Sequence, residues 1–287
     1  MTFTIVTDST SDLPISWVQE NDVTVLGLTI NLDGVTYETV GENRLTSADL
    51  LEKMASGSQP TTSQVNVGQF EEVFEAAAKE GHEVLYLAFS AALSGTYQSA
   101  VIARDMVMDQ YPDVVITIVD TKAATIGEGY LVMKAVEARA AGKTLAETKA
   151  IVEDLVPRLR TYLLVDDLNH LVRGGRLSKA AALIGGLVNI KPLLALNAEG
   201  KLEAIAKIRG RKKGIKEMLN LTLDGLDHST VMVAYTGDIE VAEGVKSSLL
   251  EDDRISDVLL TELGPVIATH TGTGVLAILS IGTAMRA

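Results

Sequence analysis

The chain has 287 residues, which is enough for one large domain or two smaller ones. Its formal net charge of −13 argues against a general nucleic-acid surface, because phosphate binding needs clustered Lys and Arg. The absence of cysteine excludes disulfides, thiolate catalysis and cysteine-ligated metals, and with only four histidines we expect no metal site. The first residues do not resemble a signal peptide, and no apolar run is long enough to span a membrane, so we expect a cytoplasmic protein.

Apolar, β-prone runs alternate with helical patterns through the first half of the chain. This alternation predicts βαβ units and a mostly parallel sheet. We expect strands at 2–6, 23–32, 84–89 and 114–119, and helices at 14–20, 70–79, 96–108 and 126–141.

The pattern changes near residue 157. Thr144 and Glu147 have the spacing of a capping box, and the helix that they begin should stop before Pro157. We therefore place a domain boundary there, with one α/β domain at 1–157 and a second at 158–287.

The second half mixes hairpins with helices. A strand at 162–165 precedes a tight turn at 173–176 and a short helix of small residues at 178–185. A hairpin around 197–200, a helix from about residue 211, a strand at 231–235, a helix at 239–250 and two late strands follow. This order predicts a second α/β domain with a partly antiparallel sheet.

The turn Leu93-Ser94-Gly95-Thr96 joins a predicted strand to a predicted helix. The first backbone N–H groups of a helix are unpaired, and the positive end of its dipole lies there. Hydroxyls beside such a helix start favour a bound anion.

Two further polar loops have both a structural and a functional interpretation. The segment 7–14 is either a turn in which Ser11 or Asp12 caps the next helix, or a loop at the ligand crevice of a parallel sheet. The segment 60–64 is an ordinary polar turn when taken alone.

His270 follows an apolar strand in the pattern and stands among hydroxyls and glycines, which favours a site over a structural role. Gly272, Gly274 and Ala277 match a dinucleotide-binding spacing, but too few residues follow for the required βαβ unit. A hydrolytic pair of Ser94 and His270 is an alternative for which the sequence offers no identifiable acidic partner.

Six Lys and Arg residues lie within 207–216 of this acidic chain. The run is either a solvated helix start or a docking surface for an acidic partner. Positive charges at a helix N-terminus are mildly unfavourable because of the helix dipole, and this cost favours the docking surface.

Five segments in order resemble the DegV family of bacterial fatty-acid-binding proteins, which are subunits of a two-component fatty acid kinase. They read TDSTSDLP at 7–14, TSQ at 62–64 with Gly68 and Phe70 after it, LSGTYQSA at 93–100, RGGRLSKAAALIGGLVNIKPLL at 173–194, and GPVIATHTGTG at 264–274. The sequence departs from the family pattern at 65–68, where Pro-Ser-Pro-Gly is usual, and at 90–92. The resemblance implies an N-terminal parallel-sheet domain like that of DegV and dihydroxyacetone kinase, and a C-terminal mixed-sheet α/β domain.

The resemblance also implies a fatty acid, such as palmitate, stearate or oleate, between the two domains. Its carboxylate would meet Thr62 and Ser94, with Gly95 and His270 close by. The family site would further be lined by Asp8, Ser9, Ser11, Ser63, Thr96 and Thr271. The tail would need an aliphatic tunnel, for which 180–186 is either a wall or a close helix contact.

A separate ATP-binding kinase subunit would phosphorylate the bound fatty acid for phospholipid synthesis, and Arg173, Arg209 and Arg211 would dock it. The chain itself would then be a carrier without a cofactor and without its own catalysis, with transient contact to a membrane surface. The alternatives are a Ser94-dependent lipid esterase and a regulatory module that binds another small carboxylate.

Overall fold

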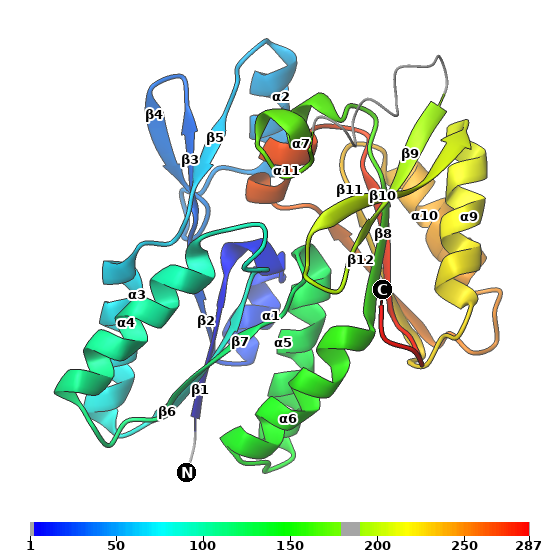
Figure 1. Cartoon of the computed structure of the whole chain (residues 1–287). Coiled ribbons are helices and arrows are strands. Elements are labelled where there is room, and N and C mark those ends of the chain that lie inside the picture. The colour runs from blue at the N-terminus through cyan, green and yellow to red at the C-terminus, as the bar shows by residue number, and fades with distance from the viewer. Residues whose placement is uncertain (1–2, 179–189, 287) are drawn as a thin grey trace.

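The computed structural model describes residues 3–178 and 190–286, which form three sheets with their covering helices (Figure 1). Sheet A is parallel, with strand order β2-β1-β6-β7, as the alternating pattern predicts. Its strands are β1 (Phe3–Asp8), β2 (Val23–Leu26), β6 (Glu83–Ala88) and β7 (Ile116–Asp120).

Helices cover both faces of sheet A (Figure 1). On one face lie α3 (Val67–Glu80) and α4 (Thr96–Gln110), and on the other α1 (Ile15–Glu20), α5 (Thr125–Ala140) and α6 (Leu145–Leu155). The predicted capping box is present at the start of α6, where Thr144 and Glu147 bond reciprocally.

A small antiparallel sheet B, in the order β4-β3-β5, projects beyond sheet A together with α2 (Ser47–Ala55) (Figure 1). Its strands are β3 (Thr29–Leu32), β4 (Val35–Glu38) and β5 (Thr61–Ser63). The prediction of one strand over 23–32 is wrong, because the chain leaves sheet A after Leu26 and begins β3 at Thr29. At the break, Gly27 has no room for a side chain, since a Cβ would lie 2.8 Å from Val40.

Sheet C has the order β10-β9-β8-β13-β11-β12 and is antiparallel except for the pair β11–β12. This confirms the predicted mixed sheet and its hairpin. Its outer face is covered by α9 (Arg211–Leu223) and α10 (Ile239–Leu249). The strands are β8 (Leu159–Leu164), β9 (Ile190–Leu196), β10 (Leu202–Arg209), β11 (Thr230–Tyr235), β12 (Asp257–Glu262) and β13 (Leu276–Ile281).

Helix α5 lies between sheets A and C and belongs to one hydrophobic core with both. It is buried almost all round, as expected for a helix with apolar neighbours on every side. Gly127 allows a close approach to sheet C, since a Cβ there would lie 2.7 Å from a methyl of Leu279. The shared core fixes how the two sheets face one another, and this arrangement shapes the space described below.

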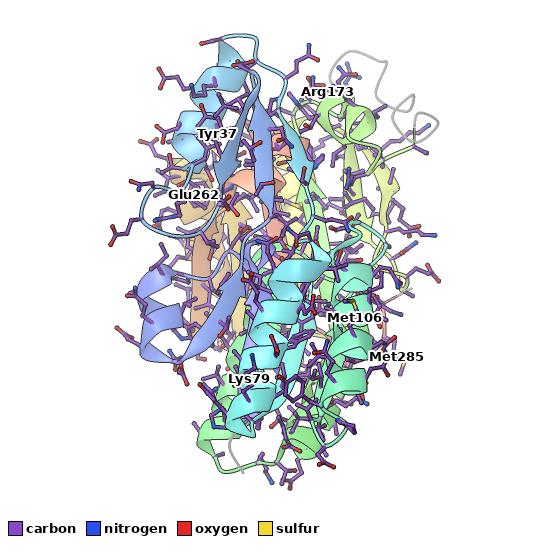
Figure 2. The ribbon with its side chains drawn as sticks, turned by 90° about the vertical axis from the view of Figure 1, so that its left-hand side faces the viewer. Tyr37, Lys79, Met106, Arg173, Glu262 and Met285 are labelled. Carbon is purple, nitrogen blue, oxygen red and sulfur yellow. The ribbon has the colours of Figure 1, made fainter. Side chains whose placement is uncertain are left out.

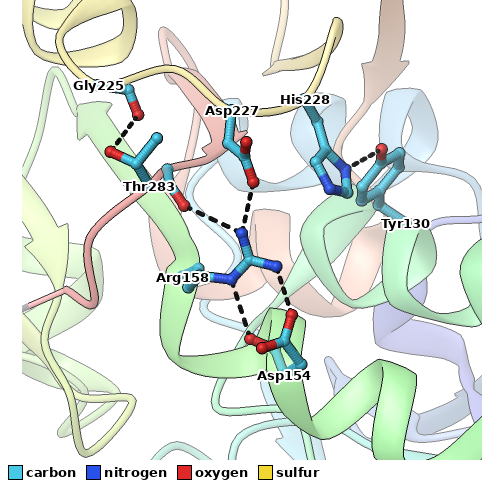
Figure 3. Close-up of polar contacts among 8 residues, drawn as sticks. Tyr130, Asp154, Arg158, Gly225, Asp227, His228 and Thr283 are labelled. Atoms are coloured by element: carbon cyan, nitrogen blue, oxygen red, sulfur yellow. Dashed lines mark hydrogen bonds and ion pairs between the residues drawn. The ribbon is translucent and has the colours of Figure 1, made fainter.

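The chain crosses from α6 to sheet C through Arg158, which ties three segments together (Figure 3). Its guanidinium bonds Asp154 at the end of α6, and it donates to Asp227 after α9 at 2.5 Å. Beside it, the Tyr130 hydroxyl lies 3.1 Å from Nδ1 of His228. The crossing is therefore held by ion pairs on the surface, away from the polar loops named above.

Candidate functional site

A cavity lies between the inner face of sheet C, the start of α4, strand β5 and the short helix α11 (Pro265–Thr271). Most of its wall is aliphatic. The polar residues of the lining come from strands, loops and helix ends: Thr62, Gln64, Ser94, Thr125, Thr161, Arg176, His270 and Thr271. The apolar residues of the lining are Leu28, Phe89, Leu93, Ala124, Leu163, Leu171, Leu196, Leu202, Leu263, Val266, Ile267, Val275 and Ala277. No Asp or Glu belongs to this lining in the described part of the chain.

Thr62 and His270, which are 208 residues apart in sequence, meet at the cavity with 2.8 Å between Oγ1 and Nε2. His270 lies in the last turn of α11, so the apolar strand predicted just before it is wrong. Burial lowers the pKa of His270 to about 4, and the charges of Arg176 and Arg173 act in the same direction. The imidazole is therefore neutral at pH 7. In the tautomer with its proton on Nε2, it donates to Thr62 and leaves the threonine proton free for a ligand.

Ser94 and Gly95 sit at the start of α4, where unpaired helix N–H groups face the cavity region. Ser94 Oγ accepts from the Thr96 amide at 3.2 Å and lies 2.9 Å from Thr96 Oγ1. Where Thr96 is the hydroxyl donor, Ser94 keeps its own proton for a ligand. Gly95 leaves room for the end of the Gln64 side chain, whose Oε1 would lie 2.1 Å from a Cβ at that position.

Arg176 lines the cavity, and the sequence did not single it out, although it belongs to the RGGR turn. Its Nε donates to the carbonyl of Leu93 at 3.0 Å, which places the guanidinium beside the Ser94 turn. Burial lowers the pKa of Arg176, so the surroundings disfavour its charge when no anion is present. Gly174 in the same turn makes room for His270, since a Cβ there would lie 2.2 Å from Nδ1.

The structure places Asp8 away from the cavity, which corrects the expectation that it lines the site. Asp8 is fully buried at the end of β1 and accepts hydrogen bonds from the Tyr86 hydroxyl at 2.7 Å and the Phe89 amide at 3.2 Å. The amide and hydroxyl of Thr10 complete its partners at 3.1 and 2.5 Å. Asp8 thus caps the short 3-10 helix Ser9–Ser11 and has no surface left for a ligand.

A second buried carboxyl, Glu128 on α5, shares this network. Thr7 contacts both the Leu87 carbonyl and Glu128 Oε1 at 3.0 Å, but it has a single proton. Because a carbonyl can only accept, Thr7 can satisfy both neighbours at once only where Glu128 is protonated and donates to it. Burial, followed by the nearby charge of Asp8, raises the pKa of Glu128 well above its usual range.

Ser9 and Ser11 also lie outside the cavity lining, and both border a separate groove near α1 and α2. Ser9 Oγ lies 2.8 Å from Thr39 Oγ1, and Ser11 donates to the Asp8 carbonyl at 2.9 Å. The segment 7–14 is therefore a structural turn. Neither side chain belongs to the lining of the cavity.

Asp12 does not cap α1, which has no side-chain cap. Its Oδ2 accepts from Thr125 Oγ1 at 2.6 Å, and its carboxyl also bonds the Gly264 backbone just before α11. Asp12 thus joins two walls of the cavity, the start of α5 and the start of α11. Burial raises the pKa of this carboxyl to about 7.

Of the remaining residues predicted from the sequence, one lines the cavity and the others lie outside its lining. Thr271 lines the cavity, whereas Thr96 is buried behind Ser94, and Ser63 points to the exposed Asn31 side chain at 2.9 Å. Arg209 is exposed, while Arg211 donates to Asp166 at 3.0 Å and to the Gly274 carbonyl at 2.7 Å. The predicted tunnel wall at 180–186 lies outside the described residues.

The predicted hydrolytic pair is not assembled in the parts of the chain that the structure describes. Ser94 bonds Thr96 and His270 bonds Thr62, and no hydrogen bond joins Ser94 to His270. No carboxylate orients His270 there. An imidazole with a pKa near 4 is also a weak base at neutral pH, so the geometry disfavours an esterase.

Comparison with known proteins identifies the family. A family model described as "Uncharacterised protein, DegV family" matches residues 2–283. The chain belongs to the DegV family. A DegV domain-containing protein of Streptococcus pyogenes serotype M1 is 57% identical over 286 residues, covering 100% of both chains.

Solved DegV structures share the fold over almost the whole chain. A DegV family protein from Thermus thermophilus, described by its fatty acid binding, superposes with a TM-score of 0.88 at 34% identity, covering 98% of this chain and 100% of the other. A stearic acid-binding protein from Eubacterium ventriosum superposes with a TM-score of 0.87 at 25% identity, covering 98% of each chain.

Two further findings concern the residues at 3–178 and 190–286. None of their helices is long and apolar enough to cross a membrane. They contain no group of three or more His, Asp or Glu side chains that could hold a metal ion.

Proposed function

We propose that this DegV protein binds a long-chain fatty acid such as palmitate, stearate or oleate, with its carboxylate at Thr62, Ser94, Gly95 and His270. One observation carries the proposal: in a chain with a net charge of −13, an aliphatic cavity is lined by hydroxyls, one histidine and one arginine, without a carboxylate among the described residues. Such a lining suits a molecule that is long and apolar with one anionic end.

The head-group end supports the same proposal. A carboxylate removed from water needs several donors, or its pKa rises until it is neutral. Thr62 and Ser94 each offer a hydroxyl proton where His270 and Thr96 are the donors to them, the start of α4 adds backbone N–H groups, and Arg176 adds a positive charge. The relatives described as binding fatty acids are consistent with this ligand.

The tail supplies most of the affinity in this proposal. At about 0.8 kcal/mol per buried methylene, roughly fourteen methylenes give at most about 11 kcal/mol before ordering costs. The head group then fixes the register of the chain in the cavity. On this proposal the ligand lies between an N-terminal domain at 1–157 and a C-terminal domain at 158–287.

The test is the ligand that the protein carries. The chain is purified from cells, denatured and extracted, and the extract is analysed by mass spectrometry. We expect a stoichiometric fatty acid of sixteen to eighteen carbons, roughly the tail length assumed above. A different carboxylate in stoichiometric amount would favour a regulatory module, and no uptake of added palmitate or oleate would refute the proposal.

The ligand would be presented to a separate ATP-dependent kinase that forms the acyl phosphate in the cytoplasm. Arg173, at the exposed end of α7 (Asn169–Arg173), stands at the surface in Figure 2, close in sequence to the cavity residue Arg176. Arg209 is exposed on the edge strand β10, whereas Arg211 is held by Asp166 and is a weaker candidate for docking.

The partner proposal has its own test. Arg173→Ala should lower kinase-dependent acyl-phosphate formation at least tenfold, an effect of about 1.4 kcal/mol, while fatty acid retention stays unchanged. Arg254→Ala is the control, because that exposed side chain pairs with Asp252 elsewhere on the surface. Equal loss of retention and phosphorylation in Arg173→Ala would contradict a docking role.

A further inference from the structure

The inner face of β8 carries one polar side chain. Side chains alternate along a strand, so Leu159, Thr161 and Leu163 share the face toward α5, and Thr161 and Leu163 line the cavity. Thr161 is 5% exposed, and its hydroxyl is buried without a hydrogen-bond partner among the described residues. Every other polar residue of the lining named above either bonds a neighbour or belongs to the head-group end.

Strand register places Thr161 at the end of the cavity that lies away from His270. β13 follows α11, and its Ala277 pairs with Leu163, whereas Leu279 pairs with Thr161. Each step of two residues along a strand covers about 6.6 Å. Thr161 therefore lies about that far beyond the Leu163–Ala277 pair, where the acyl tail rather than the carboxylate would run.

An unpaired hydroxyl at this place has an energetic consequence. A buried hydroxyl without a partner is unfavourable by about 5- to 150-fold in an equilibrium constant, and valine has nearly the same shape without this penalty. A saturated tail leaves the hydroxyl unpaired. A tail with a hydrogen-bond acceptor at the same depth relieves the penalty on binding.

We propose that Thr161 is a specificity-determining residue that selects acyl chains with a hydrogen-bond acceptor in their distal part. The acceptor would be the oxygen of a hydroxyl on the chain or, more weakly, the π electrons of a double bond. This inference rests on the proposed fatty acid binding and adds which fatty acids the cavity prefers. A substitution that removes only the hydroxyl of Thr161 is therefore enough to test the inference.

The test is competition between stearate and two kinds of modified chain, oleate and a positional series of hydroxystearates. Relative affinities are measured for the wild type, Thr161→Val and Thr161→Ser, all as full-length protein. We expect the wild type to prefer one hydroxystearate over stearate by about tenfold and oleate by about two- to fivefold. Thr161→Val should abolish both preferences, and Thr161→Ser should retain them.

The outcomes separate the two proposals. Unchanged preference ratios in Thr161→Val, or no preference for any modified chain in the wild type, would overturn the role of Thr161 while leaving fatty acid binding intact. A failure of wild type and variants to bind stearate, oleate and hydroxystearates alike would refute the proposed function itself. If Thr161→Val does not fold, Thr161→Ala is used, and persistence of the wild-type preference in it would count equally against the role.

Discussion

Two buried polar regions of the molecule, the Asp8–Glu128 cluster and the His270 end of the cavity, use their hydrogen bonds differently. In the cluster, Asp8 has four donors within 3.2 Å, and Glu128 is paired to Thr7 and Thr10. At the cavity, Thr62 and Ser94 are each oriented by one neighbouring side chain, and each keeps a proton free where that neighbour is the donor. Both regions contain residues of the motifs that resemble the family, yet only the second has hydrogen-bonding groups on a cavity surface that a ligand can reach.

The difference gives a physical criterion for telling a structural motif from a binding motif. Burial raises the pKa of Asp8 above its usual value, yet removing this carboxyl leaves its buried donors unpaired and is therefore costly. Polar groups that are held in place but keep unused hydrogen-bonding capacity suit the binding of a ligand. Substitutions in the two regions should therefore separate stability from ligand affinity.

The largest expected effect is in the cluster. Asp8→Ala leaves four buried donors unpaired and should lower the free energy of unfolding by about 3–5 kcal/mol, measured by urea denaturation. Glu128→Gln is the matched comparison, because burial raises the pKa of Glu128 well above its usual range and an amide resembles the neutral acid, so it should change stability by about 1 kcal/mol or less. The fraction of Asp8→Ala that remains folded should bind fatty acid normally. Weakened binding at unchanged stability would place Asp8 in the site after all.

Asp12 lies between the two regions and should make stability depend on pH. Its pKa is 3.8 in the unfolded chain and about 7 in the folded one. Between these values the folded state holds the proton that the unfolded state has lost, so stability is full below about pH 4 and falls as pH rises to about 7. At 1.36 kcal/mol per unit, the span of about three units gives up to about 4 kcal/mol.

The measurement is the free energy of unfolding of the wild type and Asp12→Asn at several pH values from 4 to 8. The difference between them should shrink or reverse toward high pH, where the asparagine avoids the cost of a buried charge. Asp113→Asn, an exposed substitution, provides the control for other titrating groups. A constant difference between wild type and Asp12→Asn would show that Asp12 does not titrate in this range.

At the cavity, Thr62→Ala and Ser94→Ala should each weaken fatty acid binding by about 1.5–3 kcal/mol, or roughly 10- to 150-fold, because each removes a hydrogen bond to a charged group. Neither should change stability by more than about 1 kcal/mol. Ser63→Ala, beside Thr62 but exposed and bonded to Asn31, should leave affinity unchanged. If ligand occupancy persists in both cavity variants, the carboxylate lies elsewhere.

Sequence patterns predicted the large elements and the motifs of the head-group end. Apolar periodicity identified the sheet A strands except for the break after Leu26, and motif resemblance identified Thr62, Ser94 and His270, which line one cavity. Sheet B was missed because its strands have three or four residues and β5 is entirely polar. Its pairing with β3 depends on contacts made about 30 positions or more apart, as between Ile30 and Thr62, which local propensity does not report.

The other omissions share a physical cause. Glu128 belongs to a helix whose sequence shows no sign that all its faces are buried, so its protonated state follows only from the two sheets around it. Thr161 resembles any threonine in a strand until its neighbours are known. Arg176 did have a signal, since it occupies the same RGGR turn as Arg173, but sequence alone does not tell which arginine turns inward.

The smallest expected effect concerns the charge of His270, and it tests whether the head group lies beside it. A bound carboxylate favours the imidazolium, so the pKa of His270 should rise from about 4 by at least about one unit when the cavity is filled. The titration is followed by NMR with and without fatty acid, with the signal assigned through His270→Gln. Binding then takes up a proton between the free and bound pKa values, and affinity for the ionised ligand falls as pH rises through the bound value. The signal of the surface residue His82 is the reference, because ligand should not change it. If ligand leaves the His270 signal unchanged as well, the carboxylate binds at Ser94 and Arg176 without contacting the imidazole.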